Sequence, residues 1–164
     1  SNLLLHWCNV GAVFLEVARV LQVGGTFLFS TLGPDTLMEL RAAWAEVDDC
    51  PHVHEFIDMH NLGDALVTAG FSEPVLDTDR VSMTYKEVPQ LVDELRHAGG
   101  ANVRLDRRRA CTGKKRYGQF VAAYEAFRER ERLSSTWEVI YGLATKDRAT
   151  AEQSIPVVTR PGGN

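Results

Sequence analysis

A run of basic side chains between residues 104 and 116 is the part of this sequence best suited to bind an anion. It contains Arg104, Arg107, Arg108, Arg109, Lys114, Lys115 and Arg116, opposed only by Asp106. The planar guanidinium of arginine matches carboxylate and phosphate groups. The cluster also stands out in a chain whose net charge is -4. Charge runs are often solvated loops, however, so the residues alone leave a solvated surface loop as an equal alternative.

Two other segments have residue types that suit ligand binding. His52, His54, Asp58 and His60 are of the types that ligate metals. No second metal-binding motif accompanies them, so we expect a polar surface loop and no metal site. The loop Gly33-Pro34-Asp35-Thr36 follows a predicted strand, a position where α/β folds bind ligands. The sequence has no Ser-His-Asp pattern, P-loop or G-x-G-x-x-G fingerprint.

Alternating helices and strands are predicted to position these residues. The stripe of Val13, Val17, Val20 and Leu21 predicts a helix that ends at Gly24-Gly25. The apolar run Thr26–Thr31 predicts a strand that is buried on both faces. Further helices are expected from Leu37 to Val47, from an Asn61 cap to Ala69, over Val88–Leu95 and over Tyr117–Phe127, and further strands over Val75–Tyr85 and Thr136–Thr145. This order indicates part of a larger α/β sheet.

Composition narrows the class of protein. The 164 residues predict one domain, which we place at residues 1–146, followed by a tail at 147–164 that we expect to be disordered. The acidic balance excludes a generally basic nucleic-acid binder. No stretch has the roughly 18 apolar residues that a membrane span needs. Three widely spaced cysteines indicate neither a disulfide framework nor a zinc ribbon, so a cytoplasmic location is expected.

Several segments, in order, resemble the malonyl-[acyl-carrier-protein] O-methyltransferases of biotin synthesis. The first is Ser1–Cys8, which is similar to the family pattern S-N-L-A-x-Q-W-C. Leu15–Gly25 is similar to a helix that is widespread among methyltransferases, although Val23 stands where proline is usual. The more specific matches are Phe29–Leu37, Leu40–Trp44, Pro51–Val53, Phe56–His60, Gly100–Asn102, Arg107–Arg108 with Thr112–Gly113, and Thr136–Gly142.

The resemblance implies the carboxyl-terminal half of a class I, Rossmann-like methyltransferase sheet. Its three main strands would be Thr26–Thr31, Val75–Tyr85 and Thr136–Thr145, with the last antiparallel between the other two. The family's glycine-rich loop and the acidic residue that follows its second strand would lie upstream of Ser1. We therefore expect this chain alone to bind S-adenosylmethionine negligibly and to be inactive. The strand Thr26–Thr31 would keep a free edge, through which a chain that folds alone would self-associate.

The resemblance also implies a reaction and a set of roles. A methyl group would pass from S-adenosylmethionine to the free carboxyl of a malonyl thioester, carried by acyl carrier protein or coenzyme A. Arg107 and Arg108 would hold the malonyl carboxylate, or both that carboxylate and the carrier. The remaining expected roles are carrier docking for Lys114, Lys115 and Arg116, contact with the cofactor for Asn2 and Leu3, and lining of the acyl pocket for Trp7, Thr31 and Phe56.

Two alternatives remain at this point. The chain could be part of another class I methyltransferase that acts on a small molecule such as a quinone, which would not need the arginine loop. It could instead be a non-catalytic module that binds a carrier protein. Neither nucleic acid nor a membrane is expected as a partner.

Overall fold

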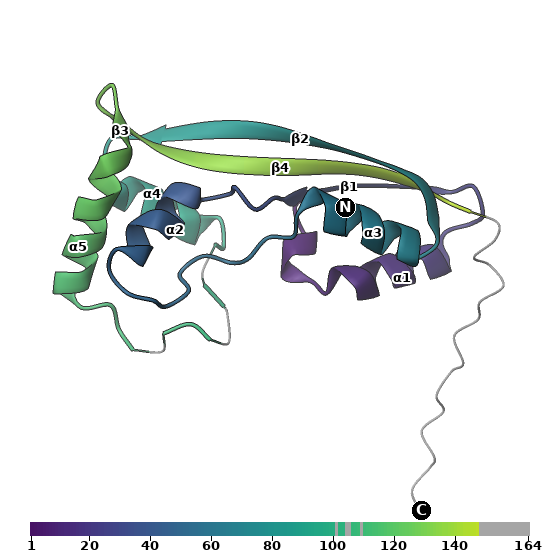
Figure 1. The fold of residues 1–164 in the computed structure, drawn as a ribbon, viewed down its shortest axis with the longest axis horizontal. Helices are drawn as coiled ribbons and strands as arrows, with labels where there is room; N and C mark the ends of the chain where they lie inside the picture. Colours follow the sequence, from purple (N-terminus) through teal and green to yellow (C-terminus); the bar gives the residue numbers. More distant parts are fainter. Residues whose placement is uncertain (101, 104–105, 109, 148–164) are drawn as a thin grey trace, which may run out of the picture.

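Two long antiparallel strands form the spine of the molecule. The computed structural model describes residues 1–100, 102–103, 106–108 and 110–147. The strands β2 and β4 run the length of the molecule, and the helices lie beneath them (Figure 1). In chain order the elements are η1 (Leu5–Trp7), α1 (Val10–Val20), β1 (Thr26–Leu32), α2 (Met38–Ala45), α3 (Met59–Thr68), β2 (Phe71–Tyr85), α4 (Val88–His97), α5 (Lys114–Tyr124), η2 (Glu125–Phe127), β3 (Arg128–Glu129) and β4 (Arg132–Lys146).

The sheet has the order β1-β4-β2, and β4 is antiparallel to both neighbours. This arrangement confirms the predicted position of the last strand between the other two. The long strands exceed their predicted bounds, because β2 begins at Phe71 and β4 begins at Arg132. The short strand β3 joins β4 through Arg130 and Glu131, which both have positive φ angles, as a two-residue hairpin turn requires.

The free edge of β1 is partly covered by the first residues of the chain. Asn2 forms a parallel bridge with Ser30, and the Leu3 amide donates to the Ser30 carbonyl at 3.0 Å. The Ser30 amide in turn donates to the Ser1 carbonyl at 3.0 Å. The expectation of an entirely unpaired edge was therefore wrong, because Ser1–Leu3 runs alongside the strand. Self-association of the chain stays a prediction.

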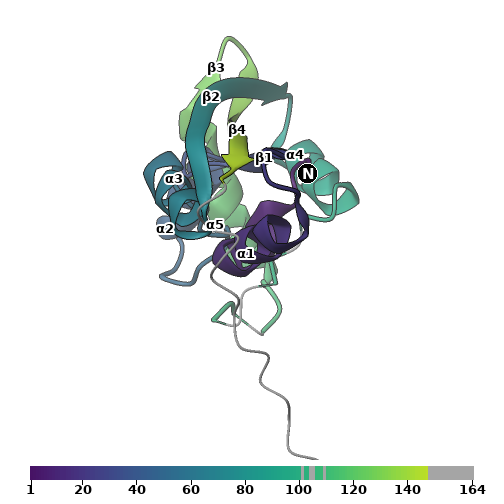
Figure 2. The same cartoon turned by 90° about the vertical axis from the view of Figure 1, so that its right-hand side faces the viewer.

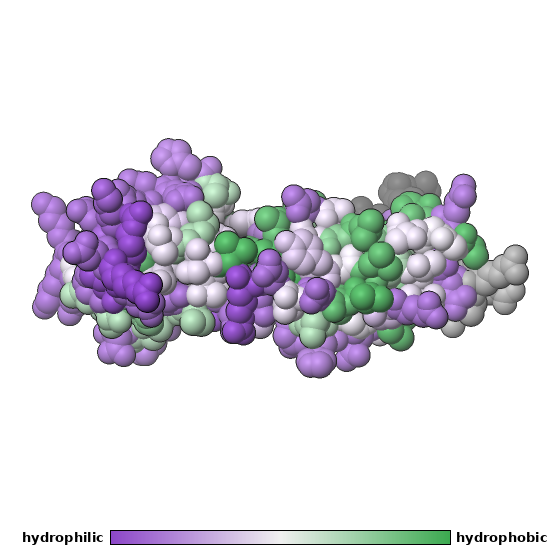
Figure 3. All heavy atoms as spheres, turned by 90° about the horizontal axis from the view of Figure 1, so that it is seen from above, coloured by the Kyte–Doolittle hydropathy of each residue, from purple (hydrophilic) through white to green (hydrophobic). Residues whose placement is uncertain are grey.

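One face of the sheet is left without helices. Figure 2 shows the curved ribbon from its end, with the helices packed below and beside it. The opposite face carries exposed apolar side chains, seen from above in Figure 3 toward the end that holds α1 and α3. They include Leu28, Val75, Tyr141 and Leu143, of which Leu28 is 62% exposed. The prediction that β1 is buried on both faces was therefore wrong, because helices cover only one of its faces.

Side-chain caps fix where two of the helices begin. Asn9 caps α1 by accepting a hydrogen bond from the Ala12 amide at 3.0 Å. Asp58 caps α3 by accepting from the Asn61 amide at 2.9 Å, so the predicted cap at Asn61 lay three residues too late. The apolar stripe predicted for α1 was correct at Val13, Val17 and Leu21, which pack against the core. It was wrong at Val20, which is exposed, and it omitted the buried Phe14 and Ala18.

Two separate hydrophobic clusters pack against the ribbon. The first joins η1, α1, β1 and α3 around the buried side chains of Phe14, Phe29, Leu62 and Leu66. The second joins α2, α4 and α5 around Leu91, Phe120, Tyr124 and Leu133. Burial raises the pKa of the Tyr124 hydroxyl, which donates to the Ser134 carbonyl at 2.9 Å. The two clusters lie at opposite ends of the ribbon in Figure 1.

No helix among the described residues is long and apolar enough to cross a bilayer. The described structure ends at Asp147, so the predicted tail lies outside the described residues except at that position.

Candidate functional site

An apolar cavity lies between the second cluster and the residues of η1. Its volume is about 210 Å³, below the roughly 300–1,000 Å³ of common ligand pockets. That size suits a small chemical group. Its walls come from η1 and the residues before it, the end of β1, α2, the loop between α2 and α3, the end of α4, and β4. The lining residues are Leu3, His6, Trp7, Leu32, Leu37, Leu40, His52, Val53, His54, Phe56, Leu95, Ala98, Gly100, Asn102 and Trp137.

The cavity wall is almost free of formal charge. Among the described lining residues none is lysine, arginine, aspartate or glutamate, and the titratable side chains are three histidines. Two lining residues, Leu3 and Leu37, have left-handed backbone angles with φ of 46° and 56°. Non-glycine residues adopt such angles at an energetic cost, and these conformations often occur at functional sites. Two of the five described non-glycine residues with positive φ angles therefore line the cavity.

Aromatic rings form one wall of the cavity. The His6 ring lies 5.1 Å from the Trp7 ring and 5.9 Å from the Phe56 ring, measured between centroids. His54 meets Trp7 edge-on at 4.9 Å. Burial, with a smaller effect from the charge of His54, lowers the pKa of His6. At neutral pH His6 is therefore a neutral imidazole, which can both donate and accept hydrogen bonds.

A buried indole N–H also belongs to this site. Trp137 lies on β4, lines the cavity and packs against the second hydrophobic cluster. Its Nε1 is buried and has no hydrogen-bond partner among the described residues, and the same is true of Nδ1 of His6. Buried polar atoms are normally paired, so two unpaired polar atoms beside one cavity indicate a site that binds polar groups.

Only some of the residues expected in the acyl pocket or near the cofactor line the cavity. Trp7 and Phe56 line the cavity, and so does Leu3, which we expected near the cofactor. Thr31 is fully buried within β1 and is not among the lining residues. Asn2 lies at the edge of β1, where its side-chain oxygen accepts a hydrogen bond from the Ser30 hydroxyl.

Next to the cavity, a stack of three rings ties a loop to two helices. His52 stacks on Trp44 with centroids 3.8 Å apart, and Trp44 stacks on Phe120 at 4.3 Å. His52 Nε2 lies 2.8 Å from the Asp48 carboxylate. That hydrogen bond is the main cause of a lowered pKa of Asp48, to which the charge of Arg108 also contributes.

The basic residues gather outside the cavity wall. Arg107 and Arg108 are exposed, and neither lines the cavity. Lys114 and Lys115 are exposed in the first turn of α5, and Arg116 lies 3.6 Å from the Asp48 carboxylate. Arg104 and Arg109 lie outside the described residues. The structure thus places the described basic side chains on the surface beside the site.

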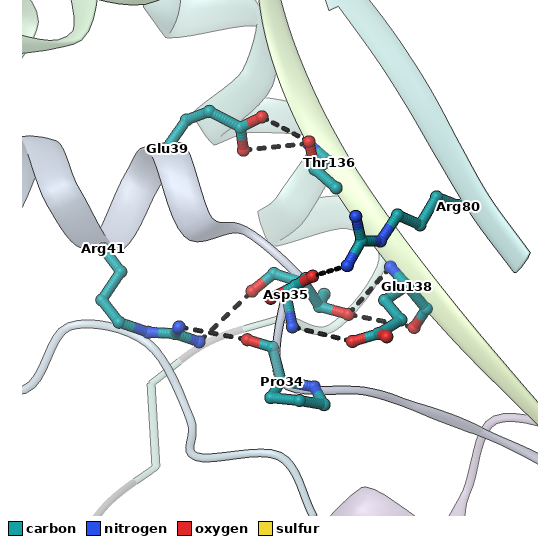
Figure 4. A network of polar contacts seen from close by, with 8 residues as sticks. Pro34, Asp35, Glu39, Arg41, Arg80, Thr136 and Glu138 are labelled. Atoms are coloured by element: carbon teal, nitrogen blue, oxygen red, sulfur yellow. Dashed lines mark hydrogen bonds and ion pairs between the residues drawn. The ribbon is translucent and has the colours of Figure 1, made fainter. Parts of the chain in front are cut away.

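The loop that begins at Gly33 is bound to β4 (Figure 4). The Asp35 amide donates to Glu138 Oε2 at 2.9 Å, and Asp35 also pairs with Arg80. A Cβ on Gly33 would lie 2.5 Å from Glu138 Oε2, so glycine is needed there. The polar groups of this loop are therefore engaged by β4 and by Arg80 of β2, and its role in ligand binding stays a prediction.

A second set of contacts in Figure 4 fixes the start of α2. Arg41 donates to the carbonyls of Pro34 and Thr36. The buried carboxylate of Glu39 accepts from the Thr136 amide at 2.9 Å and from the Thr136 hydroxyl. These bonds hold α2, and with it Leu37 and Leu40 of the cavity wall, against β4.

The histidine-rich segment does not converge on one point. His52 pairs with Asp48, His54 packs against Trp7, and Asp58 caps α3. Within the described ranges, no three His, Cys, Asp or Glu side chains form a group that could hold a metal ion.

Sequence reasoning missed His6 and Trp137 as site residues. Both stand in segments that carry the family resemblance, Ser1–Cys8 and Thr136–Gly142. His54 was noticed only as a metal candidate, although its position between Val53 and Phe56 places it in the cavity wall.

Comparison with known proteins supports the resemblance. A "Malonyl-[acyl-carrier protein] O-methyltransferase" from Laribacter hongkongensis is 44% identical over 156 residues, which cover 94% of this chain and 52% of that protein. A protein of the same name from Nitrosospira multiformis is 45% identical over 89% of this chain and 48% of its own length. This chain is a relative of the malonyl-[acyl-carrier protein] O-methyltransferases. It spans about half the length of the curated relatives that it matches.

The fold has a solved counterpart. A crystal structure from Bacillus halodurans, of a protein assigned as a methyltransferase, matches with a TM-score of 0.53 at 17% identity. The match covers 89% of this chain and 67% of that one. At this identity the likeness concerns the fold alone, and it confirms the expected methyltransferase sheet. No protein-family model matches the chain.

Proposed function

We propose that this chain is the acceptor-binding part of an enzyme that methylates the free carboxyl of a malonyl thioester. The observation that carries the proposal is the identity of 44–45% to malonyl-[acyl-carrier protein] O-methyltransferases along about nine-tenths of the chain. The cavity adds support, because segments that resemble the family, including Leu3, Trp7 and Phe56, form its wall.

The reaction makes modest demands on the acceptor site. A carboxylate is already nucleophilic, so holding it in line with the methyl donor and excluding water contribute more than removing a proton. The enclosed apolar wall suits this task, since it removes water from around a small acyl group. The half-exposed side chain of Leu3 lies at the boundary between the cavity and the surface.

S-adenosylmethionine would supply the electrophilic methyl group. The residues of this chain fit only a part of that cofactor, because Leu3 lines the cavity and Asn2 lies next to it at the edge of β1, but the sequence contains no glycine-rich loop. We therefore assign to this chain the acceptor side of the site and derive no step through the cofactor.

The carrier protein would dock on the basic surface beside the cavity. Lys114 and Lys115 are exposed at the start of α5, and Arg107 and Arg108 are exposed in the preceding loop. Gly100 and Asn102 belong to the cavity wall and stand a few residues before those arginines. An acyl group attached to a carrier at this surface would therefore have a short path into the cavity.

The test is to join this chain to the amino-terminal half of the Laribacter hongkongensis relative and to measure methyl transfer from labelled S-adenosylmethionine to malonyl-carrier protein. We expect methylated thioester with the fusion and none with either half alone. An inactive fusion, together with tight binding of malonyl-carrier by this chain, would favour the non-catalytic carrier-binding alternative. Activity on a quinone instead of the thioester would contradict the proposal.

A further inference from the structure

Two polar atoms of the cavity have no partner among the described residues. Trp137 Nε1 is an obligate hydrogen-bond donor, and His6 Nδ1 belongs to an imidazole from the other side of the cavity. They come from β4 and η1, which are 131 positions apart in the sequence but meet at this cavity. A buried donor without an acceptor destabilises the folded protein, so its retention needs a reason.

The chemistry of the surrounding wall limits what can accept this hydrogen bond. The described lining residues include neither a lysine nor an arginine, so the wall offers no permanent cation for a bound anion. The remaining wall is mainly leucine, valine and aromatic carbon, which favours a small, largely apolar group. The uncharged thioester carbonyl oxygen of a short acyl chain matches both properties, because it accepts a hydrogen bond and is attached to apolar carbon.

We infer that the indole N–H of Trp137 donates a hydrogen bond to an oxygen of the acyl group that enters this cavity, with His6 as the second polar contact. The inference rests on the proposed function and assigns to it a positioning residue of the acceptor site. Trp137 acts by fixing the direction of the acyl group. The indole itself takes no part in bond making.

The neighbouring contacts keep the indole in place. Trp137 follows Thr136, which is bound to the buried Glu39 carboxylate, and precedes Glu138, whose side chain and backbone hold the loop at Gly33. On the adjacent strand Trp137 is paired with Val81. The backbone at Trp137 is therefore fixed from both sides, and a donor with a fixed direction can select the orientation of a ligand.

The three tryptophans of the chain provide an internal comparison. Trp137 and Trp7 line the cavity, whereas Trp44 lies in the ring stack outside it. In a 15N-labelled chain each indole gives one N–H resonance, which tryptophan-to-phenylalanine variants assign. We expect malonyl-pantetheine to shift the Trp137 resonance downfield and to leave that of Trp44 in place. Pantetheine alone, which lacks the acyl oxygens, should not produce the Trp137 shift.

Affinity gives a second measurement. Trp137→Phe keeps an aromatic ring but removes the donor, so binding of malonyl-pantetheine should weaken about three- to tenfold. Trp44→Phe is the matched control and should bind as the unchanged chain does. An unmoved Trp137 resonance at saturating malonyl-pantetheine, or equal shifts with pantetheine alone, would overturn the inference. Methyl transfer by the fusion described above would then still support the proposed function, so the two failures can be distinguished.

Discussion

Thr36 and Glu138 exchange two hydrogen bonds across 102 positions of the chain. The Thr36 hydroxyl donates to the Glu138 carbonyl at 3.1 Å, and the Glu138 amide donates to the same hydroxyl oxygen at 3.2 Å. Thr36 is fully buried, so water does not compete for either bond. One side chain thus joins the start of α2 to the central strand.

Replacing Thr36 with valine should destabilise the chain. The change preserves the shape of the side chain but leaves the buried Glu138 amide without its acceptor, while the Glu138 carbonyl keeps only its bond from the Gly33 amide. The loss should lower the free energy of unfolding by about 1–3 kcal/mol. Urea denaturation measures this loss. Thr36→Ser is the control, since it keeps the hydroxyl and should retain most of the stability. Equal stability of the valine variant and the unchanged chain would contradict the role assigned to Thr36.

Gly142 should tolerate no side chain while Phe29 is present. The two residues are paired in the register of β1 and β4, and a Cβ on Gly142 would overlap the Phe29 ring. Gly142→Ala should therefore lower the free energy of unfolding by about 1–3 kcal/mol. In a Phe29→Ala background the same substitution should have much less effect, which a double-mutant cycle detects. Additive effects of the two changes would argue against the contact.

The Asp48–His52 pair should make stability depend on acid pH. The hydrogen bond from His52 lowers the pKa of Asp48 below its usual value of 3.8 in the folded chain. The ionised form therefore contributes its full stabilisation above pH 3.8, and this is lost as the pH falls through the lower folded pKa. Denaturation between pH 5 and pH 2 should show a steeper loss in the unchanged chain than in Asp48→Asn. Parallel curves would mean that Asp48 titrates normally.

The basic surface should matter for the carrier more than for the acyl group. Arg107 and Arg108 are exposed and stand outside the cavity wall. Their joint replacement by glutamine should weaken binding of malonyl-carrier protein about five- to tenfold at low salt, and by less at high salt. Lys114→Gln with Lys115→Gln should act in the same way. Binding of malonyl-pantetheine serves as the reference, and a large loss there would place an arginine on the malonyl carboxylate instead.

The uncovered sheet face should promote association of this chain with itself. Leu28, Val75, Tyr141 and Leu143 lie on that face in a shallow hollow that Ser1 and Asn2 border. Exposed apolar patches and strand edges favour contact with other chains. Light scattering at high concentration should detect oligomers, and Leu28→Lys with Tyr141→Lys should reduce them. A clean monomer of the unchanged chain would contradict this prediction.

The order of the strands in the sheet could be predicted because the family resemblance and the alternation of apolar and polar residues indicated the same strands. Val81, Met83 and Tyr85 alternate with polar residues, and the family resemblance placed the last strand between the other two, where the structure has it. The start of α3 could not be predicted as securely. Asp58 and Asn61 are both residue types that cap helices, and the choice is made by the Asp58 side chain, which accepts a hydrogen bond from the Asn61 amide.

The residues of the cavity wall were predicted only in part from the sequence. Trp7 and Phe56 were expected in the acyl pocket and do line the cavity. Thr31 was expected there too, but it is fully buried and is not part of the cavity wall. The contribution of Trp137 depends on β4 passing over α2 and α4, which no local pattern encodes. The left-handed backbone angles of Leu3 and Leu37 could not be predicted either, because leucine rarely adopts this conformation.

The separation of the core into two clusters has a mechanical consequence. Among the described residues, the cavity wall shares Leu37, Leu40, Val53, Phe56, Leu95 and Trp137 with the second cluster and no residue with the first. The first cluster adjoins the wall through η1, where the buried Leu5 of that cluster is followed by the lining residues His6 and Trp7. Loosening the second cluster should therefore deform the cavity directly, whereas loosening the first should reach it only through η1.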